Sequence, residues 1–255
     1  MAWDPTRYLT FGDERSRPFL DLVARIHAEA PRHVVDLGCG TGHLTALLAR
    51  RWPDAQVEGV DSSPEMVGAA DPLSGVTCRV GDLRDWAPDE PVDVLVTNAA
   101  LQWVPGHLDL LPRLVGGVAP GGWFALQVPG NFDEPSHVRR AQLAADPRFA
   151  PHLDGVATPD AHPAEVYLRA LLDLGCEVEA WETTYLHVLK GPDPVFAWIA
   201  GTAAGPTLQA LPEALRTEFA DELKATLRVA YPASPHGTVL PFRRVFAVAR
   251  VSGRG

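Results

Sequence analysis

The stretch VVDLGCGTGHLTALLA, residues 34–49, decides the fold. A short apolar run is followed by three alternate glycines, Gly38, Gly40 and Gly42, and then by apolar residues at helical spacing. Because glycine has no Cβ, such a turn lets a ligand lie against the main chain. The amino terminus of the following helix favours an anionic group. The stretch therefore predicts a strand, a ligand-binding turn and a helix.

The alternation of strand and helix continues along the chain. Apolar runs with the composition of strands lie at 33–38, 56–61, 76–82, 92–98 and 123–130. Helical spacing separates them at 45–52, at 65–70 and, despite Pro112, at 108–118, before a PGG turn. Because the runs lack strict alternation of apolar and polar residues, we expect a parallel sheet with helices on both faces.

After residue 130 the regular order is interrupted twice. A helix at 163–174 and a strand at 177–188 resume it, but the last strand begins only near residue 238, after a helical stretch. We expect two insertions, 131–160 and 190–237, to form a helical cap over the carboxyl ends of the strands, where open α/β sheets bind ligands. The predicted fold class is a Rossmann-like, doubly wound α/β fold. Its mostly parallel sheet has seven strands, the last one antiparallel.

The predicted organisation has four parts. An amino-terminal segment, 1–30, covers the active site, and residues 31–130 form the cofactor-binding core. The two insertions form the cap. Residues 161–189 and 238–255 complete the sheet.

Composition excludes several classes of protein. The 255 residues are 46% hydrophobic and 21% charged, which is ordinary globular usage. With a net charge of -10 and no run of Lys or Arg, we expect no nucleic-acid partner. The chain opens without the pattern of a signal peptide, and no apolar stretch reaches ~18 residues. These features predict a cytoplasmic protein without a membrane partner, a monomer or weak homo-oligomer.

Two ligands compete for the glycine turn: a dinucleotide, through its pyrophosphate, and S-adenosylmethionine, through its methionyl carboxylate. The dinucleotide fingerprint G-x-G-x-x-G requires a third glycine, but His43 stands there. Asp36, two residues before Gly38, is placed to attract the methionyl ammonium, which a dinucleotide lacks. The turn therefore favours S-adenosylmethionine.

Polar residues also end the next strands. Asp61 can accept hydrogen bonds from both ribose hydroxyls, a feature shared with NAD sites. Asp82 can accept from the exocyclic amine of adenine, and Asn98 would lie beside the methionyl group; a dinucleotide leaves both unexplained. The predicted cofactor is S-adenosylmethionine, with S-adenosylhomocysteine as product. The predicted cofactor-binding residues are Asp36, Gly38, Gly40, Gly42, Asp61, Ser62, Asp82, Leu83 and Asn98.

The motifs DLGCGTG (36–42), GVDSS (59–63), GDL (81–83) and TNAALQW (97–103) resemble those of class I methyltransferases, in the same order. The chain also resembles the trans-aconitate 2-methyltransferase family over nearly its whole length, in WDPTRYLTFGDERSRP (3–18), NAALQWVPGH (98–107), EPSH (134–137) and TTYLHV (183–188). This resemblance implies transfer of the methyl group of S-adenosylmethionine to a carboxylate of trans-aconitate, or of a closely related small polycarboxylic acid, giving a monomethyl ester.

Arginines are the expected ligands of such an acid, because a planar guanidinium binds a carboxylate through two hydrogen bonds. Arg15 and Arg17 lie in the amino-terminal segment, and Arg244 interrupts an apolar strand. A surface ion pair is the alternative role for each. The predicted substrate-binding residues are Arg15, Arg17, Trp103, His107, Tyr185, His187 and Arg244; Tyr8 and His137 are further polar rings that either bind or pack.

No catalytic residue in the strict sense is required. A carboxylate with a pKa near ~4 is already ionised at neutral pH, so positioning and desolvation should suffice. The nine histidines show no metal-binding spacing, and we expect no metal.

Three alternatives stay open at this point. O-methylation of a phenol or N-methylation of an amine would need a general base, for which His107 or His187 is a candidate. An NAD-dependent oxidoreductase is disfavoured by His43 and Asp82. A non-catalytic S-adenosylmethionine-binding protein is disfavoured by the complete set of glycines and carboxylates.

Overall fold

The computed structural model describes residues 12–70 and 75–253, with side chains from residue 16 onward. The first half contains α2 (Gly12–Ala24), β1 (His33–Leu37), α3 (Thr45–Arg51), β2 (Gln56–Asp61), α4 (Pro64–Gly68), β3 (Thr77–Val80), β4 (Val92–Asn98), η2 (Leu101–Trp103), η3 (His107–Leu110), α5 (Leu111–Gly116) and β5 (Val118–Pro129). The second half contains α6 (Pro135–Ala144), η4 (Ala150–His152), α7 (Ala164–Asp173), β6 (Glu177–Leu189), α8 (Pro194–Ala200), α9 (Gly205–Ala210), α10 (Glu213–Ala230), β7 (Ala233–Ser234) and β8 (Gly237–Arg250).

The strands form one sheet in the order β3-β2-β1-β4-β5-β8-β6, and the two-residue strand β7 pairs with β8. The pairs β1–β2, β1–β4, β2–β3 and β4–β5 are parallel. The strand order reverses its direction between β1 and β4, which is the topological switch point where such sheets bind ligands. The predicted Rossmann-like class is confirmed, with β7 as an addition to the seven strands expected.

The last long strand runs antiparallel to β5. Gly121 and Gly122 exchange hydrogen bonds with Val251, whereas Gly130 donates to Arg243, so residue numbers rise along one strand as they fall along the other. The sequence placed a PGG turn before β5. Instead β5 begins at Val118, and the turn is an irregularity within the strand, where the pairing with β4 shifts register.

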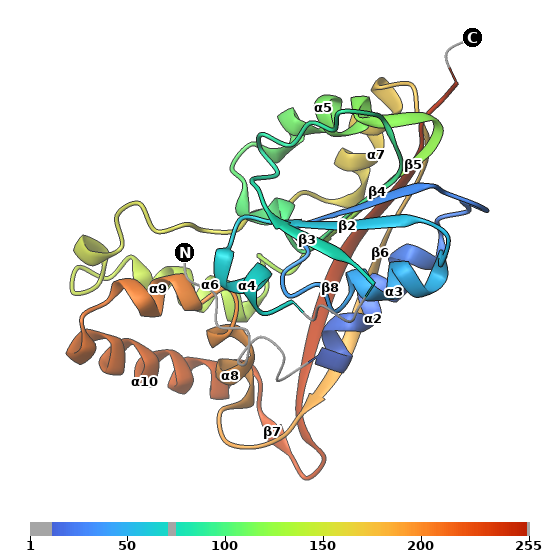
Figure 1. Ribbon diagram of the computed structural model, residues 1–255. Helices are drawn as coiled ribbons and strands as arrows, with labels where there is room; N and C mark the ends of the chain where they lie inside the picture. The colour runs from blue at the N-terminus through green and yellow to red at the C-terminus, as the bar shows by residue number, and fades with distance from the viewer. Residues whose placement is uncertain (1–11, 71–74, 254–255) are drawn as a thin grey trace. The chain divides into compact units, whose positions relative to one another are not determined.

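Helices cover both faces of the central strands, as the apolar runs indicated. Four of the five residues of β1 are buried, which fits a strand between two layers of helices. One face packs against α5 and α7, through Leu114 and Tyr167 among others. In Figure 1, α2 and α3 lie on the other side of these strands from α5 and α7.

The chain divides into two compact units. The first contains the described residues up to Val128, Ala161–Thr183 and the residues from Arg244 onward; the second contains Pro129–Asp160 and Thr184–Arg243. Both predicted insertions, 131–160 and 190–237, consist of residues of the second unit. Their position over the strand ends stays a prediction.

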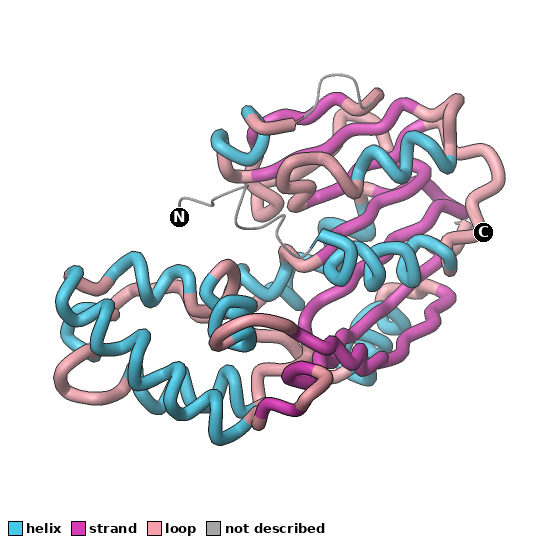
Figure 2. The backbone as a smooth tube through the Cα atoms, turned by 90° about the horizontal axis from the view of Figure 1, so that it is seen from below, coloured by secondary structure: helices cyan, strands magenta, loops and turns pink. Residues whose placement is uncertain are grey.

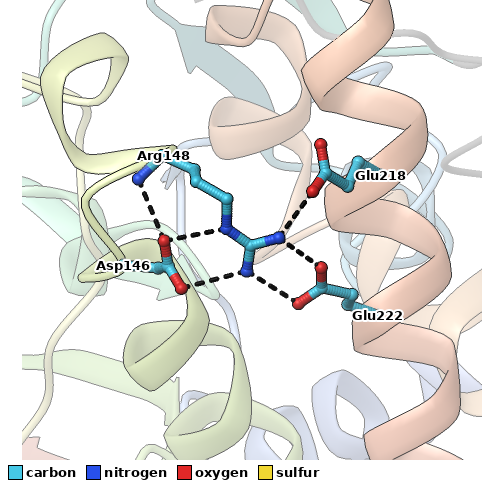
Figure 3. A network of polar contacts seen from close by, with 4 residues as sticks. All are labelled: Asp146, Arg148, Glu218 and Glu222. Atoms are coloured by element: carbon cyan, nitrogen blue, oxygen red, sulfur yellow. Dashed lines mark hydrogen bonds and ion pairs between the residues drawn. The ribbon is translucent and has the colours of Figure 1, made fainter.

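The second unit is built around its longest helix, α10, which contacts α6, α8 and α9 (Figure 2). Phe219 of α10 packs edge to face against Phe149, with ring centroids 5.1 Å apart. Beside this contact, Arg148 bonds to Asp146, Glu218 and Glu222 (Figure 3), at 2.9, 2.5 and 2.6 Å. All four side chains of this network are partly exposed, so its contribution to stability is modest.

Candidate cofactor-binding site

The glycine turn after β1 adopts a conformation that only glycine takes readily. Gly38, Gly40 and Gly42 have φ angles of +81°, +57° and +72°. A Cβ on Gly38 would overlap the Cβ of Ala100, and one on Gly42 would lie 2.9 Å from Sγ of Cys78. At Gly40, by contrast, an added Cβ would have no heavy atom of the described structure within 4 Å. The turn therefore packs tightly against its neighbours on two sides and leaves open space at its middle glycine.

Asp61, at the tip of β2, fixes this turn. One carboxylate oxygen accepts a hydrogen bond from the backbone N–H of Gly40 at 2.8 Å, and the other accepts from that of Ser63 at 2.9 Å. Each oxygen has a second lone pair, so the carboxylate can still accept bonds from a ligand. Ser62, beside it, is exposed. The structure thus brings Asp61 and the glycine turn together, as their positions at two neighbouring strand ends predict.

Asp36, on β1, is buried, and its carboxylate accepts a 2.7 Å hydrogen bond from the hydroxyl of Thr45. Burial, with a smaller contribution from the nearby charge of Asp61, outweighs the lowering by the Thr45 hydrogen bond and raises the pKa of Asp36 to about 7. An opposite charge would restore the ionised form. The methionyl ammonium that the sequence assigned to Asp36 would supply one, and that role stays a prediction.

Asp82, after β3, has a partner that the sequence did not indicate. Its carboxylate takes hydrogen bonds from the backbone N–H and the guanidinium of Arg84, at 2.8 and 2.5 Å, and these bonds lower the pKa of Asp82. Arg84 is exposed and can move aside, so a bond from Asp82 to adenine would compete with a surface ion pair. Leu83, next to it, packs against the core.

The end of β4 is the most unusual part of the site. Asn98 is followed by Ala99, whose φ of +54° is rare for a residue with a Cβ and marks local strain. Oδ1 of Asn98 is buried and accepts no hydrogen bond from the described residues. Since Ala100 lies against Gly38, this end of β4 adjoins the glycine turn.

Two polar residues beside Asn98 were missed by sequence reasoning. Gln127 pairs with Asn98 across β4 and β5, is 1% exposed, and neither atom of its amide has a hydrogen-bond partner within the described chain. The buried hydroxyl of Thr97 also has no hydrogen-bond partner within the described chain. Buried polar groups are normally hydrogen-bonded, so these groups are candidates to bond a ligand. A lone glutamine inside the apolar run WFALQV was the available signal.

Among the predicted substrate-binding residues of the first unit, three differ in how deeply they are buried. Arg17 is exposed on α2 and Trp103 is half-buried in η2. Arg244 is 7% exposed on β8, whereas Arg243 is half-buried, which fits the alternation of a strand. Arg15 belongs to α2, but its side chain, like all of Tyr8, lies outside the described residues.

His107 occupies a structural position in the core of the first unit. It is 2% exposed, and its ring nitrogens bond to the hydroxyl of Tyr167 at 2.7 Å and to the carbonyl of Val104 at 3.2 Å. It also packs against the ring of His162. Both nitrogens are therefore engaged, which disfavours a role as general base.

Tyr185 and His187 belong to an aromatic cluster of the second unit. Their rings stack with centroids 6.4 Å apart, and His187 also contacts Trp198 and Phe242. Both residues are buried. Packing accounts for this placement, and binding of a substrate by either residue stays a prediction.

A match to a protein family gives the class of this protein: it contains a methyltransferase domain. A family model described as a methyltransferase domain matches residues 11–179. Two solved structures share the fold: the YcgJ protein of Bacillus subtilis, with a TM-score of 0.60 and 14% identity over 95% of this chain and 100% of that one, and an S-adenosylmethionine-dependent methyltransferase of Mesorhizobium loti, with a TM-score of 0.53 and 20% identity over 94% and 100%.

Curated relatives specify the family. Proteins named trans-aconitate 2-methyltransferase from Streptomyces avermitilis and Mycobacterium tuberculosis are each 50% identical to this chain, covering 97% of it and 96% of the first relative, and 98% of it and 97% of the second. The chain belongs to the trans-aconitate 2-methyltransferase family. It is a methyltransferase, and its cofactor is S-adenosylmethionine.

Three features of the site fit this cofactor. The open space at Gly40 admits a ligand against the main chain. Asp61 keeps acceptor capacity for ribose hydroxyls, and Asn98 offers a buried acceptor without a partner in the described chain. Within the same residues, no helix is long and apolar enough to cross a membrane, and no group of three potential ligands gathers to hold a metal.

Proposed function

We propose that this protein transfers a methyl group to a carboxylate of trans-aconitate, or of a closely related small polycarboxylic acid, and forms a monomethyl ester. The observation that carries the proposal is the identity of 50% or more with relatives of that name, along almost the whole chain. The alignment with these relatives covers 97–98% of the chain and therefore includes the second unit.

In this proposal the glycine turn, Asp61 and Asn98 hold the cofactor, with Asp36, Ser62, Asp82 and Leu83 completing the site. S-adenosylmethionine supplies, when bound, a methyl group on a positively charged sulfur. Asp61 positions the turn through Gly40 and accepts from the ribose. The buried side chains of Gln127 and Thr97 offer further hydrogen-bonding groups to the cofactor at the ends of β4 and β5.

The chain's task toward the acid is to orient one carboxylate oxygen and to exclude water. The nucleophile is already ionised at neutral pH, so no side chain has to remove a proton. Arg15, Arg17 and Arg244 are the proposed positioning groups. They must hold the carboxylates that do not react, because a nucleophilic oxygen with strong hydrogen bonds is a poor nucleophile.

A labelled methyl-transfer assay over trans-aconitate, cis-aconitate, isocitrate, citrate and a panel of phenols and amines tests this function. We expect fastest transfer to trans-aconitate and a product that base hydrolyses, as an ester requires. A base-stable product, or faster transfer to a phenol or an amine, would refute the proposal.

We also propose that the protein acts in the cytoplasm as a monomer or weak homo-oligomer, without a nucleic-acid or membrane partner. Its net charge of -10 supports the absence of a polyanionic partner. Light scattering on the eluting protein measures the oligomeric state.

A further inference from the structure

Arg140 of α6 is a buried arginine without a counter-ion among the described residues. The residue is 5% exposed, and its guanidinium makes one hydrogen bond within the described chain, from Nη1 to the hydroxyl of Thr207 on α9, at 3.2 Å. Its Nε is buried and donates to none of the described residues. By contrast, the partly exposed Arg148 of the same unit binds three carboxylates (Figure 3). Among the described residues, the buried Arg140 therefore has a neutral hydrogen-bond partner and no acidic one.

A guanidinium stays charged at any ordinary pH, so burial does not neutralise it. Burial lowers the pKa of Arg140, which reflects the same loss of hydration. Buried charges in proteins are paired with an opposite charge or with a ligand, because an uncompensated one is costly. If the side chain served only for packing, an apolar residue at this position would give a more stable fold. The position therefore points to an anion that comes from outside the chain.

The neighbours of Arg140 on α6 are suited to a carboxylate. Ser136 and His137 lie one turn earlier on the same face, and are 1% and 6% exposed. The hydroxyl of Ser136 and Nδ1 of His137 have no hydrogen-bond partner among the residues described. Burial and the nearby charge of Arg140 lower the pKa of His137 to about 4, so at neutral pH its ring is uncharged. The helix face thus carries one positive charge flanked by neutral groups able to donate hydrogen bonds.

This face is held in place by the rest of the second unit. The backbone N–H of Ser136 donates to the hydroxyl of Tyr231, at the end of α10, at 3.1 Å. The ring of Phe132 packs edge to face against His137, with centroids 5.0 Å apart. Nearby along the chain, Oδ1 of the buried Asn131 also lacks a partner in the described structure. A binding group fixed by its own unit loses little conformational entropy when its ligand arrives.

We propose that Arg140 binds a carboxylate of the polycarboxylic acid substrate, with Ser136 and His137 donating further hydrogen bonds to it. This assignment rests on the proposed function, and it adds to the predicted ligands a residue of the second unit. No local signal in the sequence separates Arg140 from Arg139, because both occupy the middle of one helix.

Arg139 provides a matched control. It is exposed and bonds only to the side chain of Gln142, at 3.1 Å, within the described structure. The test is calorimetry in which trans-aconitate is titrated into protein saturated with S-adenosylhomocysteine, so that no turnover occurs. The proteins to compare are the wild type, Arg140→Lys, Arg140→Gln and Arg139→Gln. Loss of a charge-assisted, two-pronged contact should raise the Kd of trans-aconitate roughly 10- to 150-fold in Arg140→Gln. Arg140→Lys should fall between, and Arg139→Gln should bind like wild type.

Thermal unfolding without the acid separates binding from a structural role. Removing an uncompensated buried charge should leave the Tm of Arg140→Gln unchanged or raise it, as is common for residues kept for function. Affinity for S-adenosylhomocysteine should also be unchanged. A fall in Tm with wild-type affinity for trans-aconitate, or equal effects of the Arg139 and Arg140 variants, would overturn the assignment.

The design also separates this inference from the proposed function. If the wild type methylates trans-aconitate but Arg140→Gln does so with an unchanged KM, the role of Arg140 is refuted and the function stands. If the wild type methylates no acid, the function fails. In that event Arg140-dependent binding of citrate, measured by the same calorimetry, would still support an anion site, and its absence would refute it.

Discussion

Replacing Gly40 by alanine should separate ligand binding from folding. The new Cβ would meet no heavy atom of the described structure within 4 Å, so no overlap opposes folding. Within the described structure the destabilisation then comes from the φ of +57°, since a left-handed conformation costs an L-residue about 1 to 2 kcal/mol. For a chain of this size each kcal/mol lowers the Tm by ~2 to 4 °C, so we expect a fall of roughly 2 to 8 °C.

The same substitution should also weaken the affinity for the cofactor. The methyl group that Gly40→Ala introduces would occupy the space in which we propose that the cofactor lies against the turn. Forcing an extra methyl into a close-packed contact costs about 1 to 3 kcal/mol, which corresponds to a roughly 5- to 150-fold weaker affinity. Calorimetry with S-adenosylhomocysteine measures this change directly.

One glycine outside the site serves as a control, and one inside the turn as a comparison. Gly175, between α7 and β6, has a φ of +77° and nothing of the described structure within 4 Å of an added Cβ, so Gly175→Ala should lower the Tm equally without affecting affinity. Gly38→Ala adds overlap with Ala100 to the backbone strain and should cost roughly 2 to 5 kcal/mol of stability. Wild-type affinity in Gly40→Ala would mean that the cofactor does not lie on this turn.

Three further predictions concern charged residues. Asp61→Ala should weaken binding of S-adenosylhomocysteine by about 1 to 3 kcal/mol in calorimetry; unchanged affinity would remove Asp61 from the site. Because the folded-state pKa of Asp36, about 7, lies above its ordinary value of 3.8, its protonation favours folding at low pH. In cofactor-free protein that contribution should be lost as the pH rises from about 4 to about 7, by up to about 4 kcal/mol. Urea unfolding across this range should show a smaller decline in Asp36→Asn, and equal declines would contradict the reasoning. Arg244→Lys should raise the KM for trans-aconitate more than it weakens cofactor binding, whereas Arg243→Lys should do little; equal effects in steady-state kinetics would make Arg244 a structural residue.

The order of strands and helices could be predicted from the sequence, because the apolar patterns that indicate strands and helices depend on residues close together in the chain. The apolar runs of β1, β2 and β4 are short and bounded by glycines and polar residues, so their position is fixed by neighbours in the chain. The glycine turn was accessible for the same reason. Asp61 was correctly placed beside it, because parallel strands that are adjacent in a sheet end at the same edge.

The hydrogen-bond partners of individual side chains could not be predicted from the sequence. Asp36 bonds to Thr45 on the following helix, and both ring nitrogens of His107 are engaged, one of them by Tyr167, 60 residues away in the sequence. The type of a residue and its position in the sequence make it a candidate ligand. Whether a distant side chain already occupies the hydrogen-bonding groups of that residue is decided only when the helices and strands pack together.

Arg139 and Arg140 illustrate the difference between what the sequence predicts and what only the tertiary structure decides. The sequence predicts only that the insertion 131–160 forms part of a helical cap; on a helix, two consecutive residues point in different directions from its axis. Only the tertiary structure decides that Arg140 faces α9 and is buried, while Arg139 faces water. The physical reason is that burial and its electrostatic consequences depend on segments far apart in the chain, whereas helix formation depends on residues within a few positions of one another.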